Sequence, residues 1–289
     1  MKSLIFILVF CLFFSFCKSE NDKIQVDAKF KLEFSDSTQI SQKEILFYDS
    51  ASHLLFLKKE LVFNQSISGF CVLVNSDTIY KGIIYSCDRS APPNSTFFIS
   101  DCLLNGNNFV DIGYYSYSKD LRNDKRIINA FKNDNLLRNG LSCTIDIINV
   151  KSFIDYSEAV CKITIKNNDN INYYVLDPTK MGDLKFNYYT GGLHFHNINT
   201  KVSSFLRWSI PNSNWSDLTM NDFSILLGNS KVTYIFNSSD YYKMDKGIYS
   251  TSFNFCGILY NIKDFNLSQN NGRIWIGAAI SKMDSVIVE

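Results

Sequence analysis

Residues 161–166 read Cys-Lys-Ile-Thr-Ile-Lys, and this stretch decides the fold class of the chain. Apolar and polar residues alternate along it, which is the period of a β-strand with one buried and one wet face. Residues 167–170, Asn-Asn-Asp-Asn, have turn chemistry, and residues 171–176 return to an apolar run. We therefore predict a β-hairpin with a four-residue loop over residues 161–176.

The same alternation continues on both sides of this stretch. Residues 142–150 place Cys143, Ile145 and Ile147 on one face, and residues 29–34 alternate Phe and Leu with charged residues. Because Cys143 and Cys161 both fall on apolar strand faces, we expect them to form a disulfide pair. Residues 41–44 allow a capping box that opens a helix, but the break at residues 49–52 favours two strands around it.

Further short apolar runs, separated by turn-rich stretches, are also predicted strands. They are residues 45–48, 54–57, 70–74, 78–86, 97–104, 109–117, 185–189, 193–196, 204–210, 223–227, 231–236, 250–260 and 273–280. Asn105-Gly106 predicts a hairpin between the sixth of these runs and the one before it. The prediction is an all-β or β-dominated chain, as an antiparallel sandwich or a barrel-like fold.

Residues 120–138 are the best helix candidate, and Asn139-Gly140 provides a stop at its end. The apolar stripe of this segment is thin, which favours a short surface helix or a connection. We therefore divide the chain into a β-rich half over residues 20–119, a helical or loop connection over residues 120–140, and a second β-rich half over residues 141–289.

The first nineteen residues have the three-part layout of a secretory signal peptide. Lys2 provides a positive charge, residues 4–14 are all apolar, and residues 15–19 close the run with small or polar groups. An uncleaved anchor and a buried core helix are the alternatives, but eleven apolar residues are fewer than the roughly 20 that span a bilayer. We expect cleavage after Ser19 and a secreted protein, either extracellular or in the lumen of the secretory pathway.

Cysteine usage fits an oxidising compartment. After removal of the leader six cysteines remain, an even number that allows up to three disulfide bonds. The sequence does not choose among the pairings, and a zinc site lacks a Cys-x-x-Cys pair. The candidates are Cys71, Cys87, Cys102, Cys143, Cys161 and Cys256.

Export also gives meaning to the Asn-x-Ser/Thr sequons, which are acceptors for N-glycosylation in secreted proteins. We expect about three of them to be used, with the one beside Pro92-Pro93 the most exposed. The sequons begin at Asn64, Asn94, Asn214, Asn237 and Asn266.

The charge balance argues against nucleic acid as a partner. The chain has 29 Lys+Arg and 28 Asp+Glu, whereas a nucleic-acid binder normally carries a basic excess on one face. A hydrophobic content of 46% supports a folded core rather than disorder.

Two local features have the residue types of a binding site. His194 and His196 share a strand face at metal-ligand spacing, with His53 or Asp183 as a third ligand; the alternative is that they lie on the polar side of a strand. Trp215, in a polar loop, is the best candidate for a sugar-stacking platform with Trp208 and Trp275. Core packing of these rings is the alternative.

The common hydrolase, phosphate-binding and dinucleotide-binding motifs are absent from the sequence, so we predict no cofactor and lean against an enzyme. A glycosidase needs only two carboxylates across a cleft and has no local signature. Glu33, Glu44, Glu60 and Glu158 are available for this role, and nothing in the sequence selects a pair.

The leader, the segment Lys-Phe-Lys-Leu-Glu-Phe-Ser-Asp over residues 29–36, the Asn-rich turns and the scattered cysteines together resemble uncharacterised secreted β-rich families of social-amoeba type. The resemblance implies no activity and no functional residues.

The expected function is binding to a carbohydrate or to a cell-surface protein. The alternatives are a secreted glycan-directed hydrolase and a passive extracellular structural component. A carboxylate pair in a deep groove would favour the hydrolase, and a shallow aromatic face or an exposed sheet edge would favour binding.

Overall fold

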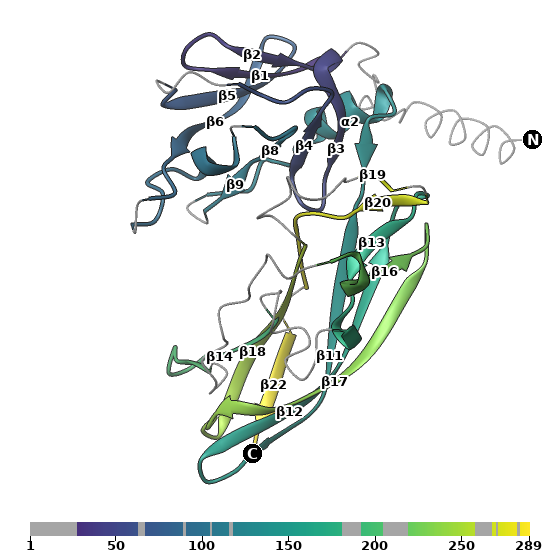
Figure 1. The fold of residues 1–289 in the computed structure, drawn as a ribbon. Helices are drawn as coiled ribbons and strands as arrows, with labels where there is room; N and C mark the ends of the chain where they lie inside the picture. Colours follow the sequence, from purple (N-terminus) through teal and green to yellow (C-terminus); the bar gives the residue numbers. More distant parts are fainter. Residues whose placement is uncertain are drawn as a thin grey trace, which may run out of the picture.

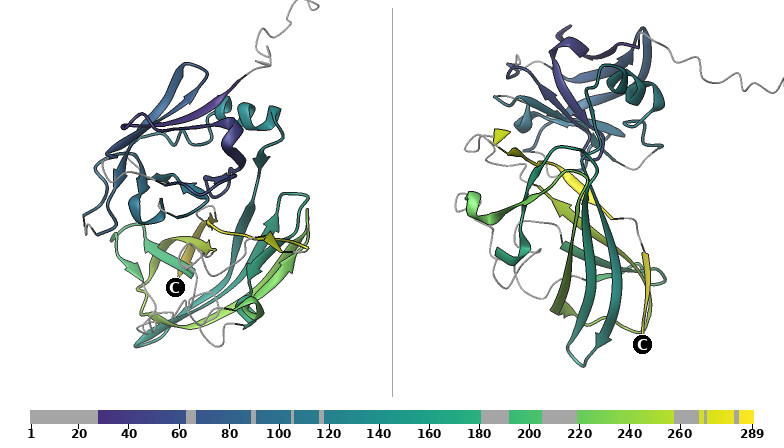
Figure 2. Two further views of the ribbon diagram at one scale, coloured as in Figure 1. Left: turned by 45° about the horizontal axis from the view of Figure 1, so that its top comes forward. Right: turned by 90° about the vertical axis from the view of Figure 1, so that its right-hand side faces the viewer.

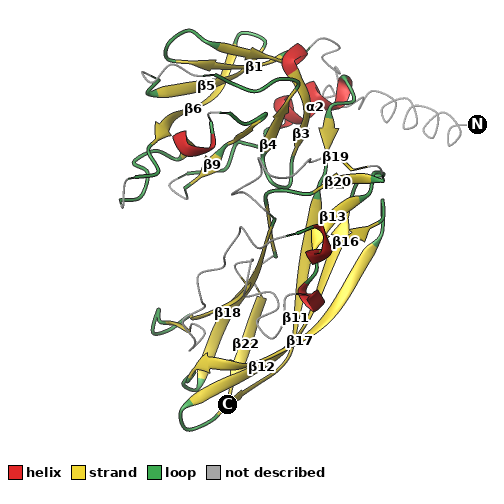
Figure 3. Cartoon of the chain, viewed as in Figure 1, coloured by secondary structure: helices red, strands yellow, loops and turns green. Residues whose placement is uncertain are grey.

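The computed structural model describes residues 28–62, 67–88, 91–104, 106–115, 118–180, 192–204, 219–257, 268–269, 271–281 and 284–289. In this part of the chain, β-strands dominate and are accompanied by one α-helix and four short 3-10 helices (Figure 1, Figure 3). The predicted β-dominated class is therefore confirmed. None of the helices in these ranges is long and apolar enough to cross a membrane.

The first half of the chain, which in the structure extends to residue 140 because residues 125–138 of the predicted connection pack with it, forms two sheets. Its strands are β1 (Phe30–Phe34), β2 (Gln39–Ser41), β3 (Ile45–Asp49), β4 (Leu54–Leu57), β5 (Gly69–Val74), β6 (Asp77–Tyr85), β7 (Phe97–Ser100), β8 (Phe109–Asp111), β9 (Gly113–Tyr114) and β10 (Leu137–Arg138). One sheet has the order β2-β1-β5-β6-β7-β9 and the other β10-β3-β4-β8. Most neighbours are antiparallel, but β6 and β7 run parallel, as do β10 and β3.

The second half forms three sheets, two of which pack face to face as a sandwich. Its strands are β11 (Leu141–Ser152), β12 (Tyr156–Asn167), β13 (Tyr173–Leu176), β14 (Gly192–Asn197), β15 (Ser203–Ser204), β16 (Phe223–Leu226), β17 (Lys231–Tyr242), β18 (Gly247–Cys256), β19 (Ser268–Gln269), β20 (Gly272–Ile274), β21 (Ala278–Ile280) and β22 (Asp284–Val288). The sheet β11-β12-β17 packs against the sheet β15-β14-β18-β21, where β22 also pairs with β18. The order β16-β13-β20-β19 makes the third sheet.

Three hydrophobic clusters hold these sheets together. The first contains only residues of the first half, from Ala28 to Leu137, and the second only residues of the second half, from Leu141 to Val288. The third cluster joins the halves, which meet end to end (Figure 2). It consists of Phe47, Leu54, Phe56 and Phe109 from the first half and Leu176, Phe223, Ile274 and Ile276 from the second.

Around residues 41–57 both local patterns occur. Ser41 and Glu44 form a capping box, but it opens only the 3-10 turn η2 (Gln42–Glu44). The apolar runs on either side of residues 50–53 are strands β3 and β4, as predicted, and the structure pairs them antiparallel. The helix does not extend beyond this single turn because the largely buried strand β3 begins directly after it, at Ile45.

The hairpin predicted over residues 161–176 is wrong. Residues 161–166 are in β12, but β12 pairs with β11 and β17, whereas β13 pairs with β16 and β20 in another sheet. The reason lies in the turn between them. Asn167 Oδ1 accepts from the backbone N–H of Asp169, and Asp169 in turn binds the chain at residues 139 and 140, so the backbone leaves the sheet here.

The hairpin predicted at Asn105-Gly106 is also wrong. β7 and β8, which flank this dipeptide, lie in different sheets, with β7 beside β6 and β9 and with β8 beside β4. The 3-10 turn η3 (Asp101–Leu103) ends the first of the two runs early. A turn dipeptide predicts a reversal of the chain, but the partner of each strand is set by packing.

The helix is shorter than residues 120–138. Helix α2 (Lys125–Asn133) begins after Asp124, whose side chain accepts from the N–H of Arg126. It ends because Asn135 has a φ of 58° and the N–H of Leu136 donates to the carbonyl of Phe131, a left-handed cap. Ile127, Ala130 and Phe131 are buried in the first cluster, so the thin stripe packs against the core of the first half.

Candidate functional site

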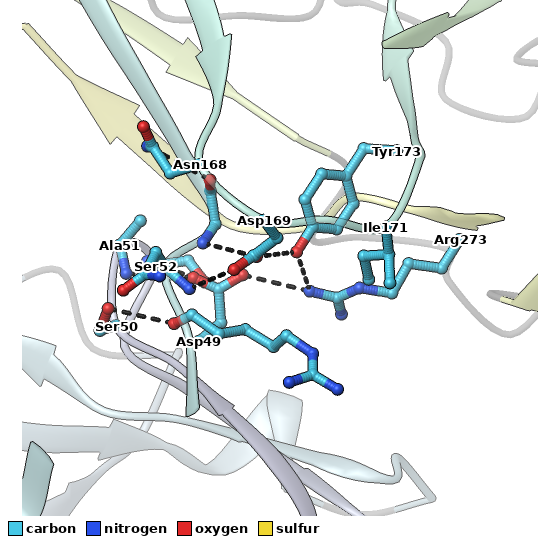
Figure 4. Close-up of polar contacts among 12 residues, drawn as sticks. Asp49, Ser50, Ala51, Ser52, Asn168, Asp169, Ile171, Tyr173 and Arg273 are labelled. Carbon is cyan, nitrogen blue, oxygen red and sulfur yellow. Dashed lines mark hydrogen bonds and ion pairs between the residues drawn. The ribbon is translucent and has the colours of Figure 1, made fainter. Parts of the chain in front are cut away.

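A buried ion pair with its hydrogen-bonding neighbours lies between the two halves (Figure 4). Arg273 on β20 extends its guanidinium to Asp49 at the end of β3, with 3.2 Å between Nη2 and Oδ2. The Asp49 side chain is fully buried, and 11% of the Arg273 side chain is exposed. Burial raises the pKa of Asp49, and the neighbouring guanidinium of Arg273 offsets only part of this rise.

The guanidinium of Arg273 is surrounded by aromatic rings. Its central carbon lies 4.1 Å from the ring centroid of Phe47, 4.9 Å from Phe56 and 4.8 Å from Tyr173. Such cation–π contacts are strongest where water is excluded. The guanidinium of Arg273 thereby contacts both the Asp49 carboxylate and aromatic rings from both halves.

A second buried carboxylate holds the chain where it passes from one half to the other. Asp169 accepts hydrogen bonds from the backbone N–H groups of Asn139 and Gly140, at 2.8 and 2.9 Å. The hydroxyl of Tyr173 donates to Asp169 at 2.5 Å and accepts from Arg273 at 3.0 Å. Asp49, Asp169 and Tyr173 are buried, and Arg273 is nearly so. This burial suits a structural connection better than a site for an external ligand.

A cluster of titratable groups surrounds Arg122 in the first half. Arg122 binds Asp120 through two hydrogen bonds, Nε–Oδ1 at 3.0 Å and Nη2–Oδ2 at 2.7 Å. The hydroxyl of Tyr48 lies 3.1 Å from Nδ1 of His53 and donates to the carbonyl of Arg122. Perturbed groups gathered in this way mark candidate functional sites.

The pKa values in this cluster move in opposite directions. Burial raises the pKa of Asp111 to about 6, although Arg122 opposes the rise. Burial also works against ionisation of Asp120, but its hydrogen bonds from Arg122 outweigh that effect and hold its pKa below the usual value. Burial, with a contribution from Arg122, lowers the pKa of His53 to about 4.

The end of the second half that lies away from the first half has a different character. We call this the distal end: the turn 153–155 between β11 and β12 and the segment 243–246 between β17 and β18 (Figure 1). Phe153 stacks on Tyr156 with ring centroids 4.7 Å apart and planes at 15°. Tyr156 lies opposite Tyr242 in the β12–β17 register, and Tyr242 is 56% exposed.

A buried hydrogen-bonded group fixes the distal end. Ser152 Oγ donates to the carbonyl of Met244 at 2.6 Å, and the N–H of Met244 donates to Ser157 Oγ at 2.8 Å. Ser157 Oγ also donates to Ser152 Oγ at 3.3 Å. These bonds join the β11–β12 hairpin to the β17–β18 connection, so the aromatic side chains are held on a rigid base.

Beside the aromatic residues lies a shallow hollow of about 450 Å³. Apolar and charged side chains line it together, among them Phe153, Ile154, Lys243, Asp245, Lys246 and Glu289. Ile154 is 85% exposed at the tip of the hairpin. Near this end, three exposed isoleucines form a row: Ile198 directly after β14, Ile248 on β18 and Ile287 on β22.

The described residues include only part of the predicted histidine and tryptophan sites. His194 is exposed on β14 and His196 binds Ser203 Oγ at 3.0 Å, whereas His53 contacts Tyr48 in the first half. In the parts of the chain with described placement, only Cys87, Asp101 and Cys102 gather three possible metal ligands. Asp183, Trp208 and Trp215 lie outside the described residues. Trp275 is buried and stacks on Phe255, as the core-packing alternative predicted.

The disulfide expected between Cys143 and Cys161 is wrong. The β11–β12 register places Cys143 opposite Ile165 and Cys161 opposite Ile147. The two cysteines are thus four residues apart along adjacent strands, about 13 Å, and a disulfide needs Cα atoms within about 7 Å. The Cys143 thiol instead donates to the carbonyl of Ala279 at 3.1 Å. Burial raises the pKa of the Cys161 thiol to about 12.

The other predicted residues are widely spread. The sequon residues Asn94 and Asn237 are exposed, whereas Asn64, Asn214 and Asn266 lie outside the described residues. Cys71 is half-buried on β5, and the backbone of Cys256 pairs with that of Ala278. Among the four glutamates, Glu33 pairs with Lys31 and Glu44 caps η2.

Sequence reasoning missed Asp49, Asp169, Arg273 and the cluster around Arg122. Arg273 and Asp49 are 224 positions apart, and no local pattern connects them. Phe153, Tyr156 and Tyr242 lie beyond the predicted strands at residues 142–150, 161–166 and 231–236, and their grouping depends on the β12–β17 register. Comparison with protein-family models and with curated proteins finds no match to this chain, so its function is argued from its own residues.

Proposed function

We propose that this protein is exported, loses residues 1–19, is glycosylated, and binds carbohydrate at the distal end of its second half. The observation that carries the proposal is the stacked pair of Phe153 and Tyr156 beside exposed Tyr242, next to a hollow rimmed by charged groups. Aromatic faces pack against the apolar faces of sugar rings, and polar groups at the rim bind hydroxyls.

The charges around the hollow suit a neutral or mixed ligand. Lys243 and Lys246 are balanced by Asp245 and Glu289, so this rim has both donors and acceptors. Binding to an anionic bilayer surface would instead be favoured by an excess of basic residues around the hollow. The buried bonds among Ser152, Ser157 and Met244 support the proposal because a rigid site loses little entropy on binding.

Export is supported by the leader and by the exposure of two sequon residues. Asn94 and Asn237 both have exposed side chains, as glycosylation requires. Asn237 lies on β17, five residues before Tyr242, so a glycan there would sit on the same strand as the binding surface. A glycan-free form is therefore needed beside the glycosylated one in binding tests.

The test is a glycan-array screen of the secreted protein, followed by calorimetric titration of any glycan that it retains. Phe153→Ala and Tyr242→Ala should each weaken binding by about tenfold, which is 1.4 kcal/mol. Ile235→Ala is the matched control, because Ile235 is 71% exposed on β17 but lies away from the distal end.

Three outcomes would overturn the proposal. These are no glycan retained above background, equal binding by all three variants, and a secreted protein that still begins at Met1. If a protein partner is captured instead and Ile287→Ser abolishes the capture, the exposed isoleucine row is the binding surface.

A secreted glycan hydrolase is the second candidate, favoured by the cluster around Arg122. Asp111 has a pKa of about 6 and Asp120 a depressed pKa, and carboxyl groups with separated pKa values are the pattern of an acid and its ionised partner. A panel of chromogenic glycosides should then show turnover by the wild type. This turnover should be lost in Asp111→Asn, although the variant should remain stably folded at pH 5. No turnover on any glycoside would reject this candidate.

A further inference from the structure

The carboxyl ends of β6 and β7 bring two cysteines to the same place. These strands are parallel neighbours, with Ile83 opposite Phe98 and Tyr85 opposite Ser100. Each cysteine lies two residues beyond the last pair of this register: Cys87 follows the end of β6, and Cys102 lies in η3, directly after β7. Neighbouring strands are about 4.8 Å apart, and disulfide-linked residues have Cα atoms about 4.4–6.8 Å apart, so the backbone spacing suits a disulfide.

The side chains of the two cysteines also lie close together. The sulfur atoms of Cys87 and Cys102 lie within 4.8 Å of one another, and both residues are exposed. The N–H of Cys87 donates to Asp101 Oδ1 at 3.0 Å, which holds the backbone of Cys87 beside η3. Hydrogen bonding with Cys102 raises the pKa of Cys87 to about 12.

We propose that Cys87 and Cys102 form a disulfide bond in the exported protein. The inference rests on the export part of the proposed function, because a disulfide persists in an oxidising compartment. As the S–S bond forms, the two thiols lose two protons and two electrons. The oxidant is a protein or small-molecule disulfide, which takes up both and is reduced to two thiols.

The bond would link the carboxyl ends of β6 and β7, two strands that are joined by a short crossover connection. Parallel strands are joined by a connection of a dozen or more residues in most proteins, whereas here residues 86–96 lead from β6 to β7. This crossover carries Pro92, Pro93 and the exposed sequon residue Asn94. A disulfide at the carboxyl ends of both strands would tie down the connection that presents this glycan.

The same residues define a competing outcome. The carboxylate of Asp101 lies within 4.8 Å of both sulfur atoms, and two thiolates with a carboxylate are ligands that Zn²⁺ accepts. A disulfide removes both thiolates and excludes the metal. The closeness of the two sulfur atoms, at the ends of neighbouring strands, favours the disulfide, and metal content becomes part of the test.

The experiment is peptide mapping of the secreted protein by mass spectrometry without reduction. We expect a linked peptide that contains Cys87 and Cys102 and is about 2 Da lighter than the two free peptides together. N-ethylmaleimide should label neither residue in the native protein before reduction. Cys102→Ser should expose Cys87 to the reagent, whereas the matched control Cys71→Ser should leave the linked peptide intact.

Free labelling of Cys87 and Cys102 in the secreted wild-type protein would overturn the inference, as would one bound zinc ion per chain. A second arm separates this failure from failure of export: full-length protein refolded in reductant is oxidised with glutathione disulfide. If the linked peptide forms there but the cellular protein begins at Met1, export is wrong and the pairing stands. If the cellular protein begins at Glu20 with both thiols free, the pairing is wrong and export stands.

Discussion

Arg273 and Asp49, from opposite halves of the chain, form a buried ion pair with 3.2 Å between Nη2 and Oδ2. The pair lies among Phe47, Phe56 and Tyr173, within the hydrophobic cluster that joins the halves. Nε of Arg273 has no hydrogen-bond partner in the described part of the chain, so the guanidinium is only partly satisfied. This contact adds one buried cation to the hydrophobic cluster that joins the halves.

Replacing Arg273 by Met should destabilise the protein by about 3–5 kcal/mol, because it leaves the buried Asp49 carboxylate without its cation. Urea unfolding followed by fluorescence measures the change, with buried Trp275 next to this site as a probe. Lys162→Met is the matched control, since it removes the exposed pair with Asp146 and should cost less than about 1 kcal/mol. Equal losses in the two variants would contradict this role of Arg273.

Gly140→Ala should also destabilise the junction, by about 1–3 kcal/mol. Gly140 has a φ of 61°, and an added Cβ would lie 2.4 Å from Oδ1 of buried Asp49. Asn135→Gly is the control at a similar φ of 58°, where the helix cap has room, and it should change stability by only a few tenths of a kcal/mol. The idea is wrong if thermal or urea unfolding finds Gly140→Ala as stable as the wild type.

Asp111→Asn should gain stability relative to the wild type as the pH rises from about 4 to about 7. The pKa of Asp111 is raised to about 6 in the folded protein, so the folded state binds its proton more tightly than the unfolded state does. Its contribution is therefore present below the unfolded pKa and is lost as the pH rises through 6, by about 3 kcal/mol in all. Urea unfolding of both proteins at a series of pH values would show a flat difference if burial of Asp111 has no such effect.

His53→Asn should show the opposite dependence at acidic pH. Burial lowers the pKa of His53 to about 4, so the unfolded state takes up a proton first and the wild type loses stability as the pH falls from 6.5 towards 4. Asn tolerates the φ of 59° at this position, and the variant should lack this loss of about 2 kcal/mol. The difference between the two unfolding free energies, measured from pH 7 to pH 4, must grow as the pH falls; a constant difference would refute the assignment.

The sequence by itself determined the β-dominated class and most strand positions, because the alternation of apolar and polar residues is a local property that survives in any packing. It showed β3 and β4, the core of β12 and β14, and the pattern of β11 without any knowledge of their neighbours. It also located a helix near residue 125, although not its end, since the left-handed cap at Asn135 competes with the later Asn139-Gly140.

Only the tertiary structure decided which strands pair and which side chains meet. The turn at residues 167–170 has the composition of a hairpin loop, yet β13 joins another sheet because Asp169 binds the backbone at residues 139 and 140. The sulfur atoms of Cys87 and Cys102 come close together because β6 and β7 are parallel neighbours, and Cys143 is kept apart from Cys161 because it lies opposite Ile165. Strand pairing and the contact between Arg273 and Asp49 depend on distances between segments far apart in the chain, and periodicity within a segment carries no information about such distances.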